Sequence, residues 1–307
     1  MTKKVIKIGT RDSELALWQA HTVQKKLNDL GYETEIVAVK STGDIILDKP
    51  LYELGITGIF TKTLDVAMLA GQVDIAVHSM KDVPTALPKG IVQAAVLERA
   101  NVLDILIHKG NLDFLASEGT IASGSLRRKA QWLHKFPTHT VEDLRGNVNT
   151  RMQKLKDNNW NGAIFAAAGL ERINLKPDTF VNLDWMVPAP AQGAMLVVAM
   201  EEDAFSREAI AQLNHKPTEI CTHIERQFLR TLEGGCTAPI GALATIDNQT
   251  IHFEGVLLSL DGKEKHTIKK SCNFDSYTNF GKKCAEKILE NGGKPVMEKL
   301  REQLKVK

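Results

Sequence analysis

The sequence predicts an α/β fold class, with two α/β domains followed by a smaller C-terminal α+β domain. Over the first two hundred residues, short apolar runs alternate with amphipathic stretches, which is the rhythm of βαβ units. After about Asn214 the pattern changes to one long helix, three successive strands and two further helices. The chain has 307 residues, 43% of them hydrophobic, so it can build a large core and is not a disordered protein.

The N-terminal segments give the first α/β domain. Residues 5–9 are predicted as a strand and residues 13–30 as a helix that ends at Gly31. The apolar residues of this helix recur at helical spacing: Leu15, Trp18, Val23, Leu27 and Leu30. Three further elements are predicted at residues 32–40 (strand), 64–69 (helix) and 73–78 (buried strand).

The same rhythm continues in the second α/β domain and then gives way to the α+β domain. Strands at 120–123 and 162–165 lead into helices at 126–136 and 170–173. The segment at 188–193, Pro-Ala-Pro-Ala-Gln-Gly, is typical of a hinge between lobes. The C-terminal domain is predicted with a helix at 217–232, strands at 240–246, 251–259 and 266–272, and helices at 277–291 and 295–304.

Composition excludes several classes of function. The 39 Lys and Arg residues against 37 Asp and Glu residues give a net charge of +2, without the basic excess of a nucleic-acid-binding protein. No apolar run approaches a membrane span, and the charged start of the chain differs from a signal peptide. We therefore expect a cytoplasmic protein. The four cysteines form no Cys-x-x-Cys pair, so no metal site is expected.

Arginines gather at the predicted strand-to-helix junctions. Six of the 11 arginines lie there: Arg11, Arg127, Arg128, Arg145, Arg151 and Arg172. In the first turn of a helix, Arg127 and Arg128 oppose the helix dipole at a cost of roughly 0.3–1 kcal/mol each, which an anion would relieve. With the hydroxyls of Ser123 and Ser125 they would form an anion site, unless the arginines only pair with local acids on a solvated surface. Because no phosphate-binding loop is present, carboxylates are the favoured ligands.

Two further segments carry candidate chemistry. Lys81 and Asp82 directly follow the predicted strand at 73–78 and act either in catalysis or as a structural ion pair, or Asp82 caps the following turn. His78 is interpreted as a core histidine. Cys236 follows two glycines, so either a group must approach its sulfur closely or the glycines only end a helix.

Together these segments resemble the porphobilinogen deaminase family along nearly the whole chain. Seven motifs carry the resemblance: Gly-Thr-Arg-Asp-Ser-Glu-Leu-Ala-Leu-Trp-Gln at 9–19, Asp-Ile-Ala-Val-His-Ser-Met-Lys-Asp-Val-Pro at 74–84, Ser-Leu-Arg-Arg at 125–128, Leu-Arg-Gly-Asn at 144–147, Ala-Gly-Leu-Glu-Arg at 168–172, Gln-Gly-Ala at 192–194 and Leu-Glu-Gly-Gly-Cys at 232–236. Their number and order make coincidence implausible.

The resemblance implies two periplasmic-binding-protein-like lobes around a cleft and a third domain that presents the cysteine. On this pattern the first lobe comprises residues 1–96 and 194–213, the second 97–193 and the third domain 214–307. It also implies a monomeric transferase of tetrapyrrole (porphyrin and haem) biosynthesis. Such an enzyme condenses four porphobilinogen molecules head to tail, with loss of ammonia, to give hydroxymethylbilane. Its primer is a dipyrromethane held by a thioether.

The matching motifs also imply residue roles. Asp82 would be the catalytic carboxylate, and Cys236 would hold the dipyrromethane covalently. The residues implied to bind this cofactor noncovalently are Lys81, Ser79, Ser13, Ser123, Ser125, Arg127, Arg128, Arg145, Arg172 and Asp82. Those implied to bind substrate are Arg11, Gln19, Arg151, Phe60 and Gln192.

These residue types suit the implied chemistry. Each porphobilinogen carries an acetate and a propionate, and permanent cations are suited to bind such carboxylates. Loss of ammonia leaves an electron-poor azafulvene, whose cationic form a fixed carboxylate such as Asp82 can stabilise. A cysteine thiolate adds to the azafulvene carbon, and the C–S bond that results resists hydrolysis.

The chain departs from the family pattern in two regions. Where the family usually has a lid reading Gly-Gly-Lys-Gly-Leu-Phe, this chain has Gly-Ile-Thr-Gly-Ile-Phe at 55–60, so Thr57 replaces a lysine. Thr42 stands where Lys or Arg is common, and Gly124 replaces a usual serine. We expect a lid that closes through Phe60 but holds substrate carboxylates less tightly, which would raise KM more than it lowers kcat.

Two other classes of function compete with this interpretation. One is a non-catalytic two-lobed binding protein for a small anionic ligand, although the expected absence of an export signal and the setting of Cys236 argue against it. The other is a nucleotide-dependent transferase, which the missing phosphate-binding loop disfavours.

Overall fold

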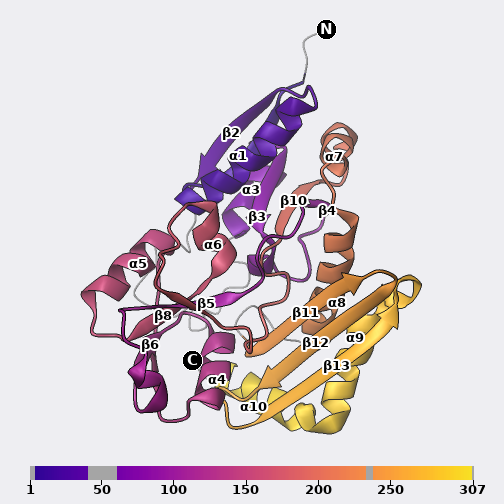
Figure 1. Ribbon diagram of the computed structural model, residues 1–307. Helices are drawn as coiled ribbons and strands as arrows, with labels where there is room; N and C mark the ends of the chain where they lie inside the picture. Colours follow the sequence, from indigo (N-terminus) through magenta and orange to yellow (C-terminus); the bar gives the residue numbers. More distant parts are fainter. Residues whose placement is uncertain (1–3, 41–60, 233–237, 306–307) are drawn as a thin grey trace. The chain divides into compact units, whose positions relative to one another are not determined.

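The computed structural model describes residues 4–40, 61–232 and 238–305 (Figure 1). The predicted residues Thr42, Thr57, Phe60 and Cys236 lie outside the described residues. The chain divides into two compact units. Among the described residues, the first unit contains 4–40, 61–100 and 193–219, and the second contains 101–192 and 220–305.

The first unit is built on a five-stranded sheet with the order β2-β1-β3-β10-β4. Its strands are β1 (Ile6–Arg11), β2 (Thr34–Val39), β3 (Ile75–Ser79), β4 (Ile91–Val96) and β10 (Met195–Met200). β1 is parallel to β2 and β3, whereas β10 runs antiparallel between β3 and β4. The chain therefore returns to this sheet after residues 101–192 of the second unit, and the carboxyl ends of β1 and β3 lie at one edge.

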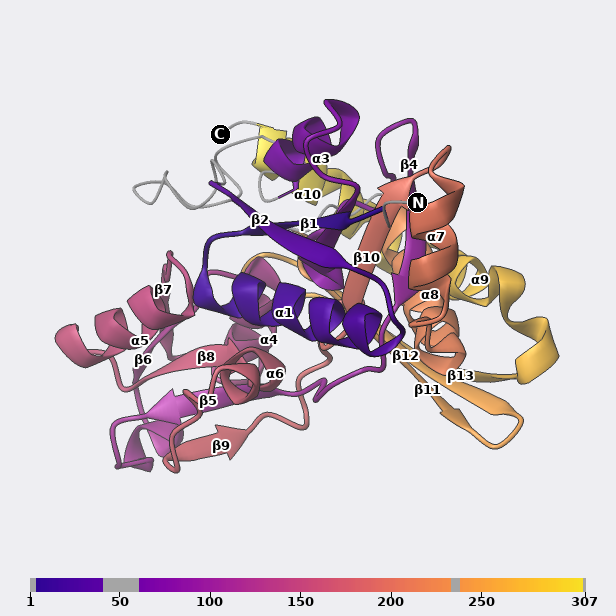
Figure 2. The ribbon, with the colours of Figure 1, turned by 90° about the horizontal axis from the view of Figure 1, so that it is seen from above.

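Helices cover both faces of this sheet. α1 (Glu14–Asp29) and α3 (Lys62–Leu69) lie on opposite faces (Figure 2). α7 (Ala204–Ala211) shares the face of α1, since both helices contribute residues to one apolar cluster with β1, β3 and β10.

Helix α1 begins and ends where the sequence predicts, but its apolar stripe was predicted only in part. Val23 and Leu27 are fully buried, whereas Trp18 and Leu30 are 37% and 46% exposed. The buried face runs instead through alanines and Gln19, whose side-chain amide donates to Ser79 Oγ at 2.9 Å. A polar side chain is buried here because it has a hydrogen-bond partner, which hydrophobic periodicity does not reveal.

The α/β part of the second unit contains another five-stranded sheet, with the order β7-β6-β8-β5-β9. Its strands are β5 (Asp104–His108), β6 (Thr120–Ala122), β7 (Thr140–Glu142), β8 (Gly162–Ala166) and β9 (Phe180–Asn182). β6 is parallel to β7 and β8, and β5 is antiparallel to β8 with Asp104 opposite Ala166. The start of β5 therefore lies at the edge where β6 and β8 end.

The side chains of this sheet alternate between two cores. On β5, Leu106 joins the cluster of Trp132 from α4 (Leu126–Lys135). Ile105 and Ile107 join the opposite cluster, which includes residues of α5 (Val148–Asp157) and α6 (Ala167–Arg172). The 3₁₀ turn η3 (Asp113–Ala116) closes the α4 side through Phe114.

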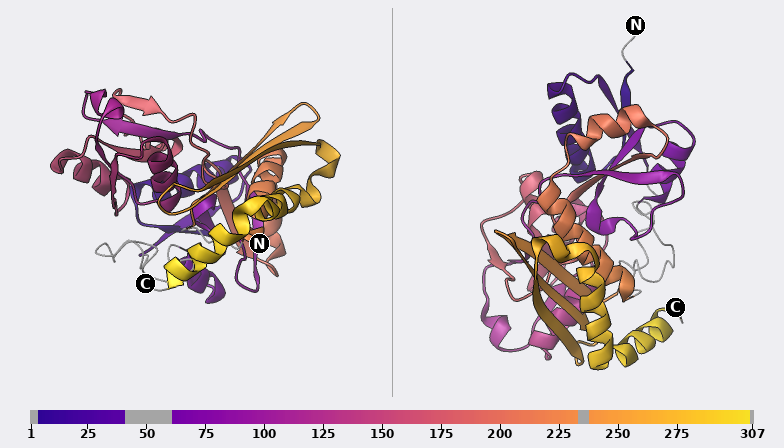
Figure 3. Two further views of the ribbon diagram at one scale, coloured as in Figure 1. Left: turned by 90° about the horizontal axis from the view of Figure 1, so that it is seen from below. Right: turned by 90° about the vertical axis from the view of Figure 1, so that its right-hand side faces the viewer.

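The C-terminal part of the second unit is an antiparallel meander covered by helices on one face (Figure 3). The strands are β11 (Ile240–Asp247), β12 (Thr250–Leu258) and β13 (Lys265–Asn273). The helices are α8 (Lys216–Thr231), α9 (Phe280–Ile288) and α10 (Lys294–Lys305). The turn η4 (Phe274–Asn279) precedes α9, and the kinked link η5 (Leu289–Gly293) follows it.

The α/β fold class is thus confirmed, with two mixed sheets and a smaller C-terminal domain. No helix in the described part of the chain has the length and apolar character needed to span a membrane.

Candidate functional site

In the first unit, the carboxyl ends of two parallel strands bring the predicted residues of that unit together. β1 ends at Arg11, and β3 ends at Ser79 before the 3₁₀ turn η2 (Met80–Asp82). The register pairs Gly9 with Ala76, so Arg11 and His78 reach the same edge of the sheet. Ser13 is the N-cap residue of α1, two residues after the end of β1.

A pocket opens at this edge of the first unit. Five predicted site residues line it: Arg11, Ser13, Gln19, Ser79 and Asp82. The remaining lining residues are Leu15, Ala16, Thr61, Val77 and His78. Lys81 lies on η2 beside Asp82 but is not among the lining residues. The pocket therefore combines a guanidinium, a carboxylate, an amide, an imidazole and three hydroxyls.

His78 adds a neutral imidazole to this pocket. Its side chain is 6% exposed. Burial, followed by the nearby positive charge of Arg11, lowers the pKa of His78 from 6.5 to about 4. The other ionisable side chains that line the pocket are Arg11 and Asp82.

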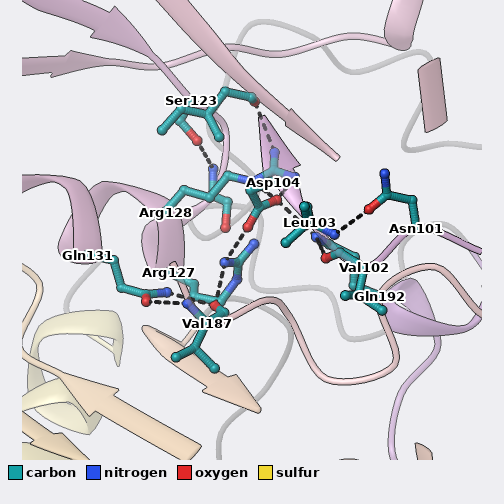
Figure 4. Close-up of polar contacts among 12 residues, drawn as sticks. Asn101, Val102, Leu103, Asp104, Ser123, Arg127, Arg128, Gln131, Val187 and Gln192 are labelled. Atoms are coloured by element: carbon teal, nitrogen blue, oxygen red, sulfur yellow. Dashed lines mark hydrogen bonds and ion pairs between the residues drawn. The ribbon is translucent and has the colours of Figure 1, made fainter. Parts of the chain in front are cut away.

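In the second unit, four residues form a buried polar group around one carboxylate, which we call the Asp104 cluster: Asp104, Arg127, Arg128 and Gln192 (Figure 4). Arg127 NH1 donates to Asp104 Oδ2 at 2.7 Å, and Arg128 Nε donates to Oδ1 at 2.9 Å. Arg128 NH2 also lies 2.7 Å from Oδ1, and Gln192 Nε2 donates to the same oxygen at 3.0 Å.

The start of α4 places both arginines beside Asp104. Ser125 is the N-cap residue of α4, and its N–H donates to Ser123 Oγ at 3.3 Å. The sequence predicted that an anion would offset the two cations in this first turn. The structure contains such an anion within the chain, because Asp104 forms ion pairs with both Arg127 and Arg128.

One donor of this cluster is not used by the described residues. Burial lowers the pKa of Arg127 below its ordinary value, and the charge of Asp104 opposes this shift. Arginine nevertheless remains protonated in proteins. Its NH1 donates to Asp104 and to the carbonyl of Val187, but its buried Nε has no hydrogen-bond partner among the described residues. A buried N–H group without an acceptor is costly, and a ligand carboxylate would supply one.

Gln192 belongs to a segment that a buried glutamate holds in place. Gln192 is fully buried and also donates to the carbonyl of Val102 at 2.8 Å. The preceding residue, Ala191, has a φ of +64°, a conformation that costs energy for a residue with a Cβ. Its N–H donates to Glu225 Oε2 at 2.6 Å, and Glu225 Oε1 accepts from the N–H of Ala244 at 2.7 Å.

The other predicted arginines of the second unit have different surroundings. Asn147 caps α5 by accepting from the N–H of Thr150, and Arg151 Nε donates to the carbonyl of Gly146 at 2.7 Å. Arg145 is buried, which lowers its pKa, although Asp143 raises it. Burial lowers the pKa of Arg172 to about 10, so it also remains charged at neutral pH.

Sequence reasoning missed two residues of these arrangements, Asp104 and Glu225. Asp104 starts the strand Asp-Ile-Leu-Ile-His, whose next three residues are apolar, and an acid in that position is a usable signal. Glu225 follows Ile224 on the buried side of α8 and is fully buried itself. Neither carboxylate could be assigned partners from the sequence, because those partners lie 23 to 88 and 19 to 34 positions away along the chain.

The donors in these sites suit carboxylate ligands. Guanidinium groups bind carboxylates through paired N–H bonds, and hydroxyl and amide groups add further donors. Within the residues that the structure describes, no group of three or more His, Cys, Asp or Glu side chains is arranged to hold a metal ion.

Comparisons with known proteins agree with this chemistry. The protein-family model described as "Porphobilinogen deaminase, dipyromethane cofactor binding domain" matches residues 6–208. The family model "Porphobilinogen deaminase, C-terminal domain" matches residues 219–290. Among solved structures, the periplasmic VFT2 domain of BvgS from Bordetella pertussis has a TM-score of 0.42 at 13% identity, over 68% of this chain and 86% of that one. That likeness concerns the fold alone.

Curated relatives cover nearly the whole chain. Porphobilinogen deaminase from Chloroherpeton thalassium is 42% identical, over 90% of this chain and 89% of the relative. The protein of that name from Pelotomaculum thermopropionicum is 38% identical over 98% of both chains. The chloroplastic porphobilinogen deaminase of Oryza sativa subsp. japonica is 40% identical, over 94% of this chain and 84% of the relative. The chain therefore belongs to the porphobilinogen deaminase family.

Proposed function

We propose that the chain is a transferase that condenses four porphobilinogen molecules head to tail, with loss of ammonia, to give hydroxymethylbilane in tetrapyrrole biosynthesis. The observation that carries the proposal is the first-unit pocket, where the carboxylate of Asp82 and the guanidinium of Arg11 line one site in a member of this family. Arg11 and Gln19 supply donors for substrate carboxylates, and Asp82 stabilises the cationic azafulvene left by loss of ammonia.

We assign a dipyrromethane cofactor to this chain, attached through Cys236. When bound, it supplies the end to which new rings are added. The unused Nε of Arg127 and the guanidinium groups beside it fit carboxylates such as those of a dipyrromethane. The proposed noncovalent contacts are Ser13, Ser79, Lys81, Asp82, Ser123, Ser125, Arg127, Arg128, Arg145 and Arg172. Those to substrate are Arg11, Gln19, Phe60, Arg151 and Gln192.

We also propose three domains with the boundaries 1–96 and 194–213, 97–193, and 214–307. The return of β10 to the first sheet supports the discontinuous first domain. A formal net charge of +2 supports a small-molecule substrate rather than nucleic acid. We also propose a cytoplasmic protein without a membrane partner, as expected from the sequence. That it is a monomer is the expectation carried over from the family resemblance.

Turnover of porphobilinogen tests the proposed function. The purified protein should consume porphobilinogen and release four ammonia molecules for each hydroxymethylbilane formed. Asp82→Asn keeps the shape of the side chain but removes its charge, so we expect kcat to fall roughly 100-fold or more with the fold retained. The matched control is Asp29→Asn, which alters an exposed carboxylate on α1 and should leave kcat unchanged.

Two results would count against the proposal. Near-normal kcat in the Asp82 variant would remove Asp82 from the mechanism. No consumption of porphobilinogen by the unmodified protein would favour a non-catalytic binding protein.

A further inference from the structure

Asp104 is a fully buried carboxylate in the second unit. Taking a carboxylate out of water is costly unless cations and hydrogen-bond donors compensate it. Here two guanidinium groups and the amide of Gln192 converge on its two oxygens at 2.7–3.0 Å. The start of β5 fixes the carboxylate at the carboxyl edge of the second sheet, where α4 begins.

Each contact of Asp104 also restricts the group that makes it. Arg128 meets Oδ1 through both Nε and NH2, and its NH1 donates to the carbonyl of Ile164 at 3.1 Å. This fixes the plane of its guanidinium. Arg127 NH1 is held between Asp104 Oδ2 and the carbonyl of Val187 at 2.7 and 2.8 Å. Arginine side chains normally lose considerable rotamer freedom when they bind a ligand, and here much of that loss occurs on folding.

Asp104 also sets the charge that the cluster offers to a ligand. Two cations and one carboxylate leave one net positive charge in a buried environment. The buried Nε of Arg127 still lacks an acceptor among the described residues. The cluster is therefore oriented but has at least one donor that a further anionic group would satisfy.

We propose that Asp104 is a positioning residue, which aligns Arg127 and Arg128 so that these two arginines hold the carboxylates of the dipyrromethane in one geometry. This inference rests on the proposed function of these arginines and extends it, because Asp104 itself meets the arginines rather than the ligand. The position of the carboxylate oxygens of Asp104 therefore matters as well as their charge.

Two substitutions in the full-length protein separate charge from position. Asp104→Asn keeps the shape and removes the charge. Asp104→Glu keeps the charge but displaces the oxygens by the length of one methylene group, about 1.5 Å. The matched control is Asp178→Asn, which removes an exposed carboxylate from the same unit. Thermal unfolding, intact mass under denaturing conditions, and kcat and KM for porphobilinogen are measured for each protein.

A positioning role predicts that both Asp104 variants lose function beyond any loss of stability. Well below the melting temperature of each variant, kcat per primer-carrying molecule should fall at least tenfold, while KM changes less than threefold. The fraction of folded protein that carries the primer mass should also fall. Asp178→Asn should match the unmodified protein in all of these measurements.

A purely structural ion pair predicts a different outcome. Relative to Asp104→Asn, Asp104→Glu would then recover kcat and primer loading to the same extent as it recovers the melting temperature. That result would overturn the proposal. If one variant does not fold, the other still decides, since normal kcat and loading in either folded variant contradict positioning. Failure of the unmodified protein to turn over porphobilinogen or to carry a primer would instead reject the proposed function, independently of Asp104.

Discussion

At the level of single residues, His78 couples stability to pH. Burial beside Arg11 lowers the pKa of His78 in the folded protein from 6.5 to about 4. Between these pH values the unfolded chain binds a proton that the folded chain does not. The contribution of neutral His78 to the free energy of unfolding is therefore fully present above about pH 6.5. It is lost as the pH falls, by about 3 kcal/mol near pH 4.

His78→Asn should flatten this dependence, because asparagine does not titrate. We expect the free energy of unfolding, measured with urea at intervals from pH 7 to pH 4, to fall less steeply in the variant than in the unmodified protein. His21→Asn alters an exposed histidine on α1 and serves as the control, with an unchanged slope expected. Equal slopes for the His78 variant and the unmodified protein would show that His78 does not titrate as described.

The sequence predicts some of the charged site residues but not all of them. Arg11 and Asp82 were predicted because both directly follow or end short apolar strands, and parallel pairing of β1 and β3 brings such ends together. Asp104 was missed because β5 runs antiparallel to β8. Its first residue, and not its last, therefore lies at the edge of the second sheet where β8 ends. Strand direction depends on the order of strands in the sheet, which local pattern does not contain.

At the level of elements, the loop between β6 and α4 explains one departure from the family pattern. A Cβ atom at Gly124 would collide with the carbonyl oxygen of Leu144, which lies just before Arg145. The usual serine would therefore push the loop that carries Arg145 away from the start of α4. The glycine at this position matches the close approach of the two loops.

Gly124→Ser should thus destabilise this protein even though it restores the family residue. We expect a loss of about 1–3 kcal/mol in the free energy of unfolding, the usual cost of overpacking. Gly124→Ala should behave in the same way, because the collision arises at Cβ and not at the hydroxyl. If either variant is as stable as the unmodified protein in urea unfolding, the two loops do not pack as tightly as described.

Most elements with a clear period were predicted, and the misses have physical causes. α1, α4, α8 and the three strands of the C-terminal meander lie within two residues of their predicted ends. β10 reads Met-Leu-Val-Val-Ala-Met, a continuous apolar run that is buried between two neighbouring strands. Such a run has no alternation to distinguish a strand from a buried helix, so it was not predicted.

At the level of the whole molecule, the residues proposed to act in catalysis and ligand binding come from segments far apart in the sequence. Arg11 and Asp82 contribute to the first unit, while Arg127, Arg128 and Gln192 contribute to the second. The proposed attachment residue, Cys236, follows α8 in the chain. Helix α8 also carries Glu225, which holds Ala191 next to Gln192. The proposed function therefore requires the full chain.

The central claim is that this chain carries a covalent primer on Cys236, and the intact mass of the denatured protein tests it most directly. The unmodified protein should exceed the mass calculated from its sequence by two linked pyrrole units. Cys236→Ser should have the calculated mass, and Cys221→Ser, which alters a buried cysteine on α8, should keep the excess. A bare mass for the unmodified protein, even after incubation with porphobilinogen, or an excess retained by Cys236→Ser, would contradict the account.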